Sequence, residues 1–216
     1  WRPTARPRRE AMIGRYCRLE PVEVTRHARE LYESLSLDAS GEGWTYLAYG
    51  PFASEADLVA WLEKETTGDA AVYYAAIDQA SGRAVGFLSY IRITPEVGAI
   101  EIGNVRFSPL LQRTPAATEA IYLMMRHVFE LGYRRCEWKC DNLNMPSHRA
   151  AKRFGFTFEG VFRQAVVYKG RNRDTAWYSV IDREWPRLHD AFERWLDPTN
   201  FDDSGRQRAK LETLRR

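Results

Sequence analysis

The sequence predicts an α/β (α+β) fold, with helices on both faces of a mixed, mostly antiparallel central sheet of about seven strands. The first half holds two alternating segments, at 72–77 and 84–93, which a Ser81-Gly82 turn would join as a hairpin. The second half alternates strand and helix patterns, as parallel pairing requires. Antiparallel hairpins followed by strand-helix-strand units therefore favour one mixed sheet.

Each element follows from its periodicity and from the residues that begin and end it. Ser54 is a typical N-cap, and Gly132 is a plausible C-cap for the helix before it. A hairpin tip is expected at 169–173. The expected strands are 16–21, 72–77, 84–93, 98–107, 134–140, 157–168 and 174–182. The expected helices are 24–36, a segment from 54, 115–131, 146–154 and 183–195.

Composition indicates one globular domain. The chain has 216 residues, of which 44% are hydrophobic, so it can bury a core. We expect this domain at 11–196, after an N-terminal extension at 1–10 and before a polar C-terminal tail at 197–216. The three cysteines, Cys17, Cys136 and Cys140, have no metal-type spacing, which predicts reduced thiols in a cytoplasmic protein without a metal.

The charge pattern argues against two classes of partner. The 32 basic and 29 acidic residues give a net charge of +3 without a concentrated basic stripe, so nucleic acid is not expected as a partner. No apolar run approaches the roughly 20 residues that span a bilayer, so a membrane is not expected either. The sequence leaves a homodimer open.

Two strand-to-helix units carry the most information. The strand GAIEIGNVRF ends at Ser108-Pro109, and the chain then passes through Gln112 to Ala117 into a helix. Backbone N–H groups at such a helix start, beside Arg113, form a place that binds phosphate. The second strand, RRCEWKC, leads into Asn144-Met145-Pro146-Ser147 and a short helix that closes on Gly155-Phe156.

In their order and spacing, the Gln-Arg-x-x-x-Ala and Asn-x-x-Ser... Gly-Phe patterns resemble the GNAT acyl-CoA-dependent N-acyltransferases. They look most like the ribosomal-protein N-terminal acetyltransferase branch. The resemblance implies an acyltransferase domain at 11–196 and a GNAT-like sheet with a splayed parallel strand pair, here 98–107 and 134–140. It also implies direct transfer of acetyl from acetyl-CoA, a co-substrate, to a primary amine in a ternary complex.

The resemblance also implies a set of acetyl-CoA contacts. One departure is Pro115, where the family usually has Gly; proline lacks an N–H, but Thr114 as N-cap and Pro115 as first residue start a helix well. The phosphate-binding N–H donors would then be those of Arg113, Thr114, Ala116 and Ala117. The expected acetyl-CoA contacts are Asn104, Val105, Phe107, Gln112, Arg113, Thr114, Ala116, Ala117, Asn144, Arg149 and Lys152.

Two residues are candidates for catalysis. Glu101 lies on the strand that would line the acyl site and is the candidate base; the alternative is a structural glutamate. Ser147 matches the family serine that would donate a hydrogen bond to the departing CoA sulfur; the alternative is a serine that satisfies the first helical turn. A family tyrosine acid is absent, because Ala151 occupies that position.

The aromatic loop at 44–52 is expected over the acceptor side, with Trp44, Tyr46 and Tyr49 as substrate contacts. The alternative is that these rings fold back over the core. The acceptor would be a protein N-terminus or an aminoacyl-like small molecule. A non-catalytic acyl-CoA-binding module of the same fold is the other reading of the chain.

Overall fold

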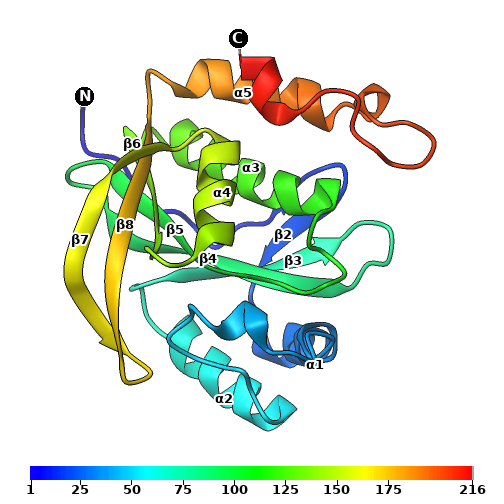
Figure 1. The fold of residues 1–216 in the computed structure, drawn as a ribbon, viewed down its shortest axis with the longest axis vertical. Helices are drawn as coiled ribbons and strands as arrows, with labels where there is room; N and C mark the ends of the chain where they lie inside the picture. The colour runs from blue at the N-terminus through cyan, green and yellow to red at the C-terminus, as the bar shows by residue number, and fades with distance from the viewer. Residues whose placement is uncertain (216) are drawn as a thin grey trace.

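The structure is a computed structural model that describes residues 1–215. These residues form an eight-stranded sheet in the order β1-β2-β3-β4-β5-β6-β8-β7 (Figure 1). All neighbours pair antiparallel except β5 and β6, which are parallel. In chain order the strands are β1 (Met12–Ile13), β2 (Cys17–Pro21), β3 (Val72–Asp78), β4 (Ala84–Thr94), β5 (Ala99–Phe107), β6 (Arg135–Asp141), β7 (Thr157–Tyr168) and β8 (Arg171–Ile181).

Helices form a layer on each side of the sheet, as Figure 1 shows. On one side lie α1 (Val24–Leu35) and α2 (Glu55–Thr66). On the other lie α3 (Pro115–Glu130), α4 (Met145–Phe154) and α5 (Trp185–Leu196). Three short 3-10 helices are η1 (Glu42–Trp44), η2 (Pro198–Asn200) and η3 (Leu211–Arg215). Each layer has its own hydrophobic core, and the core under α3, α4 and α5 is the larger.

The predicted fold class is confirmed, and most elements lie within two or three residues of their expected bounds. The two-residue β1 was not predicted, because it is too short to show alternation. The hairpin tip is tighter than expected: Lys169 and Gly170 both have positive φ, as a two-residue type I′ turn requires, and 171–173 already belong to β8. This tight turn lets the β7–β8 hairpin extend at one edge of the sheet (Figure 1).

The start of α3 is fixed by a carboxylate that the sequence did not single out. Glu119 is buried, and its two oxygens accept the backbone N–H groups of Arg15, Tyr16 and Cys17 at 2.7, 2.6 and 2.7 Å. Hydrogen bonds to a charged acceptor are among the stronger ones in proteins. Glu119 therefore ties the first turns of α3 to the turn between β1 and β2.

Replacing Glu119 by glutamine is expected to lower the free energy of unfolding by about 2–4 kcal/mol, because an amide NH2 would face backbone donors and leave them unpaired. Urea unfolding monitored by circular dichroism measures it. Glu130→Gln, on the exposed end of the same helix, serves as the control and should change stability by no more than about 0.5 kcal/mol. Equal stabilities for the two variants would contradict a structural role for Glu119.

Both terminal segments contact the domain between them. Tyr74 donates a hydrogen bond to the carbonyl of Arg8, and Arg9 donates one to the carbonyl of Gly68. In the tail, Leu211 is fully buried and Gln207 accepts a hydrogen bond from Trp195. Arg216, the last residue of the predicted tail, lies outside the described residues. No helix within residues 1–215 combines the length and the apolar composition that crossing a lipid bilayer requires.

Candidate active site

The parallel strands β5 and β6 separate part-way along their length. They pair at three positions only, and the last pair is Glu101 with Glu137. Beyond it, β5 continues to Phe107 along β4, and β6 continues to Asp141 along β8. Backbone groups on the facing edges of these two stretches have no partner strand, so the sheet opens here into a gap between two strands.

A β-bulge lies on β5 inside this open stretch. Opposite the single residue Leu88 of β4, β5 has two residues, Asn104 and Val105. Asn104 adopts a φ of 51°, and its side chain donates to the Tyr73 hydroxyl at 2.8 Å and the Ser89 hydroxyl at 3.0 Å. Asn104, Val105 and Phe107 therefore lie where β6 no longer pairs, and their contact with acetyl-CoA stays a prediction.

The helix start at 112–117 forms as predicted. Thr114 is the N-cap of α3, with its hydroxyl accepting from the Ala117 N–H at 3.2 Å, and Pro115 is the first helical residue. The Thr114 N–H is bonded to the carbonyl of Leu111. Of the four expected phosphate donors, only the N–H groups of Arg113 and Ala116 have no partner within residues 1–215.

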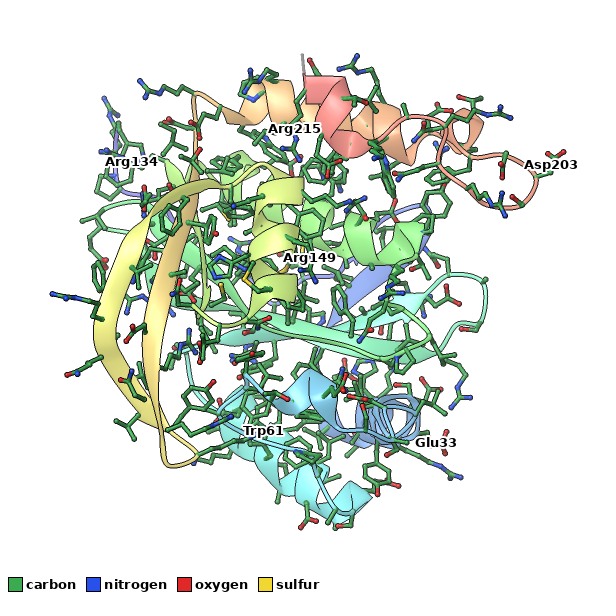
Figure 2. All side chains as sticks on the ribbon, in the orientation of Figure 1. Glu33, Trp61, Arg134, Arg149, Asp203 and Arg215 are labelled. Carbon is green, nitrogen blue, oxygen red and sulfur yellow. The ribbon has the colours of Figure 1, made fainter. Side chains whose placement is uncertain are left out.

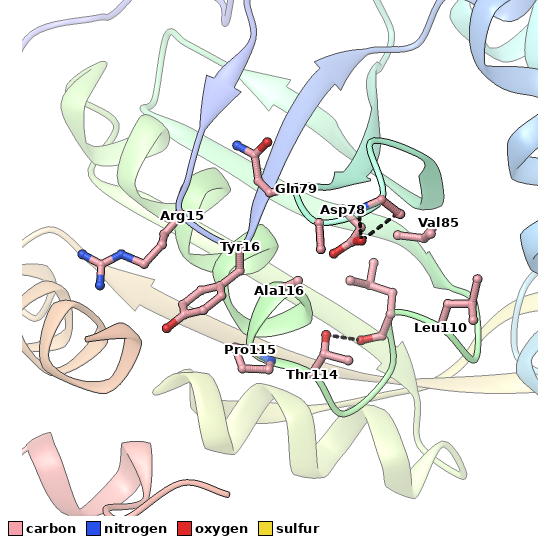
Figure 3. Close-up of a pocket in the computed structure, with 12 residues that line it drawn as sticks. Arg15, Tyr16, Asp78, Gln79, Val85, Leu110, Thr114, Pro115 and Ala116 are labelled. Atoms are coloured by element: carbon pink, nitrogen blue, oxygen red, sulfur yellow. Dashed lines mark hydrogen bonds between the residues drawn. The ribbon is translucent and has the colours of Figure 1, made fainter. Parts of the chain in front are cut away.

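Two further features surround this helix start. The Gln112 side chain donates to the carbonyl of Phe107 at 2.8 Å and so joins the loop to the end of β5. On the side facing the β3–β4 turn, a cavity of about 570 Å3 is lined by Thr114, Pro115 and Ala116 together with Tyr16 and Leu110 (Figure 3). Arg113, Asn144 and Ser147 do not line this cavity, so it borders the start of α3 away from the gap between β5 and β6.

Asn144 and Ser147 begin α4 beside the gap. Asn144 is the N-cap, and its side-chain oxygen accepts the N–H of Ser147 at 3.1 Å, which confirms the capping role. The Ser147 hydroxyl oxygen accepts the indole N–H of Trp138 at 2.9 Å. Because that contact uses an oxygen lone pair, it does not consume the hydroxyl proton of Ser147, for which the neighbouring Cys140 sulfur is an acceptor in the absence of CoA.

Glu101 is buried, with a side chain 7% exposed, and it is not alone. Its Oε2 atom lies 2.8 Å from Nζ of Lys139 and 3.5 Å from Nε of Arg92. Burial raises the pKa of Glu101 above its usual value, and the Lys139 ammonium opposes this increase. A carboxylate with a raised pKa is better suited to accept a proton near neutral pH.

The aromatic loop divides between the core and the site. Trp44 is 4% exposed and packs edge-on against Phe52. Tyr49 stacks on Trp61, with 4.2 Å between the ring centroids. These two rings therefore pack over the core, as the alternative reading of the loop states. Tyr46 instead reaches across and donates to the carbonyl of Leu143 at 3.0 Å, next to the start of α4. Among the three predicted substrate contacts, Tyr46 is the one that lies at the open end of β6.

Residues that the sequence did not single out hold this loop in place. The Lys169 ammonium, at the hairpin tip, donates to the carbonyls of Trp44 and Gly50 at 3.0 and 2.8 Å. Arg106 is 2% exposed; it pairs with Asp38 at 2.8 Å, and its guanidinium lies 4.4 Å from the Trp44 ring centroid. An arginine in a strand gives no sequence signal for such a role.

The basic residues of α4 divide in a similar way. Arg149 and Lys152 are exposed, and Figure 2 labels Arg149 on the helix. Their contact with the CoA 3′-phosphate remains a prediction. Arg153 is half-buried and donates to the Thr118 hydroxyl at 2.9 Å, which joins α4 to α3.

The remaining titratable residues do not form a second centre. All three cysteines are free and buried, and burial raises the pKa of the Cys136 and Cys140 thiols, which disfavours the nucleophilic thiolate. Residues 1–215 contain no group of three or more His, Cys, Asp or Glu side chains placed to hold a metal ion.

Comparison with known proteins identifies the family. Residues 17–157 match the model of the acetyltransferase (GNAT) domain, which is more than half of the chain. The chain belongs to the GNAT family of acetyltransferases. The splayed parallel pair expected of a GNAT enzyme is therefore β5 with β6.

A GNAT N-acetyltransferase from Brucella melitensis is 49% identical in sequence, with a TM-score of 0.97 over 100% of this chain and 98% of that one. The uncharacterized N-acetyltransferase YnaD of Bacillus subtilis (strain 168) is 28% identical over 141 residues, which are 65% of this chain and 81% of that protein.

The same fold occurs in a Salmonella typhimurium acetyltransferase that modifies the N-terminal serine of ribosomal protein L7/L12. Its TM-score is 0.68 over 80% of this chain and 99% of that one, at 22% identity. At this identity the likeness extends to the fold alone.

Proposed function

We propose that this GNAT enzyme transfers an acetyl group from acetyl-CoA to an α-amine, which attacks the thioester directly in a ternary complex. The observation that carries the proposal is the place where β5 and β6 part. Glu101 is the last paired residue of β5, and Ser147, at the start of α4, follows β6 directly. A base and a hydroxyl donor thus lie on the two strand-to-helix units that border one gap.

The donor end of the site suits the phosphates of acetyl-CoA. The free N–H groups of Arg113 and Ala116 lie at the N-terminus of α3, a long helix whose dipole favours anions. Arg113 is exposed and unpaired within residues 1–215, as are Arg149 and Lys152 on α4. Acetyl-CoA is the family's co-substrate, and these residues support its use here.

The reaction needs no covalent enzyme intermediate. The amine nitrogen attacks the thioester carbonyl carbon, the C–S bond breaks, and the amine proton passes to Glu101, directly or through water. The developing thiolate accepts a hydrogen bond from the Ser147 hydroxyl. Backbone N–H groups between Asn104 and Phe107 on the edge of β5 that β6 leaves unpaired would stabilise the oxyanion, an interaction worth about 2.7–4 kcal/mol elsewhere.

Because Glu101 is buried, its access to the amine proton is limited. An amine that loses its proton easily is therefore favoured, which means an α-amine rather than a lysine side chain. An α-amine has a pKa of about 7.7–8.0, so roughly a tenth of it is neutral at pH 7 and full deprotonation costs only about 1.4 kcal/mol. A lysine amine near 10.4 would need over 4 kcal/mol. A protein N-terminus and an aminoacyl-like small molecule both satisfy this requirement.

Free thiols at all three cysteines agree with a cytoplasmic location.

A screen of CoA thiol release from acetyl-CoA tests the proposal. The panel contains short peptides with a free N-terminus and acetyl-blocked lysines, the same peptides with a blocked N-terminus and free lysines, and aminoacyl amides. Release should depend on the protein and on a free α-amine. Tight acetyl-CoA binding without release from any amine would instead indicate the non-catalytic acyl-CoA-binding module.

Arg113→Glu is expected to weaken acetyl-CoA binding about tenfold, because it replaces a cation beside the free N–H groups by an anion that repels phosphate. Isothermal titration calorimetry at moderate salt measures the affinity. Arg187→Glu, an equal charge reversal at an exposed position of α5, is the control and should bind normally. Unchanged affinity in Arg113→Glu would remove the loop from the acetyl-CoA site.

A further inference from the structure

Two glutamates face each other at the point where β5 and β6 part. Glu101 and Glu137 are the last paired residues of the parallel strands, and their side chains are only 7% and 11% exposed. Lys139 lies two residues beyond Glu137 on β6, on the same face of the sheet, and its side chain is 6% exposed. Its Nζ atom lies 2.8 Å from Oε2 of Glu101 and 2.7 Å from Oε2 of Glu137.

The lysine ammonium is fully used by this cluster. Two of its three N–H groups are directed at the two carboxylates, and Nζ lies 3.6 Å from the centroid of the Trp177 ring, within cation–π range. Lys139 is therefore held in one position between the carboxylates.

Other charged groups surround the cluster from each neighbouring strand. From β4, Arg92 approaches Glu101, but its side chain is 60% exposed. From β6, Arg135 pairs with Glu137 at 2.8 Å and with Glu159 of β7 at 2.5 Å. β8 contributes no charged group here; its Ser179 hydroxyl donates a hydrogen bond to Glu159. Three cations thus balance three carboxylates, and Lys139 is the most buried of the cations.

Without Lys139, Arg135 would still pair with Glu137 and the exposed Arg92 would still approach Glu101, but no cation would lie between the two buried carboxylates. One of them would then take up a proton more readily. The Lys139 ammonium removes this conflict. It also holds Oε2 of Glu101 and leaves Oε1 without a partner within residues 1–215, beside Gly103, where the strands separate. A bound ammonium therefore leaves one oxygen of Glu101 free to accept a proton.

We propose that Lys139 is a positioning residue for Glu101: it keeps this carboxylate ionised and oriented, and it shares its charge with Glu137. The proposal rests on the proposed function, in which Glu101 accepts the amine proton. Glu137 opposes the ionisation of Glu101 in two ways. It competes for the attraction of the Lys139 ammonium, and its own negative charge repels that of Glu101.

Two substitutions should move the acidic limb of the profile of kcat/KM against pH in opposite directions. Lys139→Met removes the cation that lies between the two facing carboxylates, so the limb should move to higher pH. Glu137→Gln leaves the whole ammonium to Glu101 and removes a negative neighbour, so the limb should move to lower pH. Lys139→Arg retains the charge and should restore most of the wild-type profile. A purely structural role for Lys139 would lower the rate in Lys139→Met without moving the acidic limb in either variant.

A second measurement does not depend on turnover. NMR titration of protein labelled with 13C at the glutamate carboxyl carbons, with Glu101 and Glu137 assigned by their glutamine variants, follows ionisation directly. The Glu101 resonance should titrate at higher pH in Lys139→Met and at lower pH in Glu137→Gln. If Lys139→Met does not fold, the shift in Glu137→Gln alone decides.

The inference is overturned by a Glu101 titration that does not move in a folded variant, or that moves the same way in both, whatever the rates. Failure of the proposed function looks different. In that case the titrations shift as stated, but Glu101→Gln transfers acetyl at the wild-type rate at every pH. Lys139 would then still hold Glu101 ionised, and the base would be another group.

Discussion

Replacing Ser147 by alanine is expected to slow acetyl transfer by about 10- to 100-fold, by nearly the same factor at every pH. The lost interaction is one hydrogen bond to a developing thiolate, worth about 1.5–3 kcal/mol. The Trp138 indole already occupies one lone pair of the Ser147 oxygen, so the hydroxyl proton can be directed to the sulfur. The Ser147 hydroxyl and the Trp138 indole do not titrate between pH 5 and 9, so the factor should stay constant over this range.

Single-turnover rates of transfer against pH measure this effect, once an acceptor is in hand. Ser147→Thr retains the hydroxyl and should keep most of the rate, while acetyl-CoA affinity should hold in both variants. A Ser147→Ala enzyme with the wild-type rate would reduce Ser147 to the helix-start contact that it makes with Asn144.

Glu101→Gln is expected to lower the rate most at low pH and to approach the wild-type rate above pH 9. At pH 7 the loss should be about tenfold, because only roughly a tenth of an α-amine is neutral there. The sign follows from two pKa values. Burial raises the pKa of Glu101, opposed by Lys139, and below that pKa the wild-type enzyme also loses its base. The ratio of wild-type to variant rate should therefore grow as pH falls below the pKa of the amine, about 7.7–8.0, and stop growing below the pKa of Glu101.

The same single-turnover assay separates this outcome from the one for Ser147, since one effect varies with pH and the other does not. Glu101→Asp keeps a carboxylate on a shorter side chain and should show a smaller deficit at pH 7. A Glu101→Gln enzyme with wild-type rates throughout would make Glu101 structural, and the base would then be sought in the loop at 44–52 or in water held by the strand backbone.

The sequence predicts the fold well where the signals are local. Thr114 and Pro115 start α3, Ser54 caps α2, and Gly132 follows the end of α3 with a positive φ. Each of these signals lies within a few residues of the helix end that it marks. Alternation and helical spacing also act over short distances, so the order of strands and helices could be predicted together with the patterns that resemble the family.

The contacts that organise the site act over long distances and could not be predicted. Glu119 binds N–H groups about a hundred residues away, and Lys139 meets Glu101 across 38 residues. The bulge at Asn104 and Val105 adds one residue to β5, so Arg106 faces the side of Glu101, toward Trp44, which strict alternation would not allow. Aromatic composition alone could not distinguish a packed Trp44 from a Tyr46 at the gap.

The most direct test of the account is the position of the acetyl group on a peptide that offers both kinds of amine. A peptide with a free N-terminus and one free lysine is incubated with the enzyme and acetyl-CoA at pH 7, and tandem mass spectrometry locates the added acetyl. Transfer to an α-amine assisted by Glu101 predicts acetylation of the N-terminus, with the lysine unmodified at early times and the N-terminal product reduced about tenfold in Glu101→Gln. Acetylation of the lysine first, or an N-terminal rate that Glu101→Gln leaves unchanged, would contradict it.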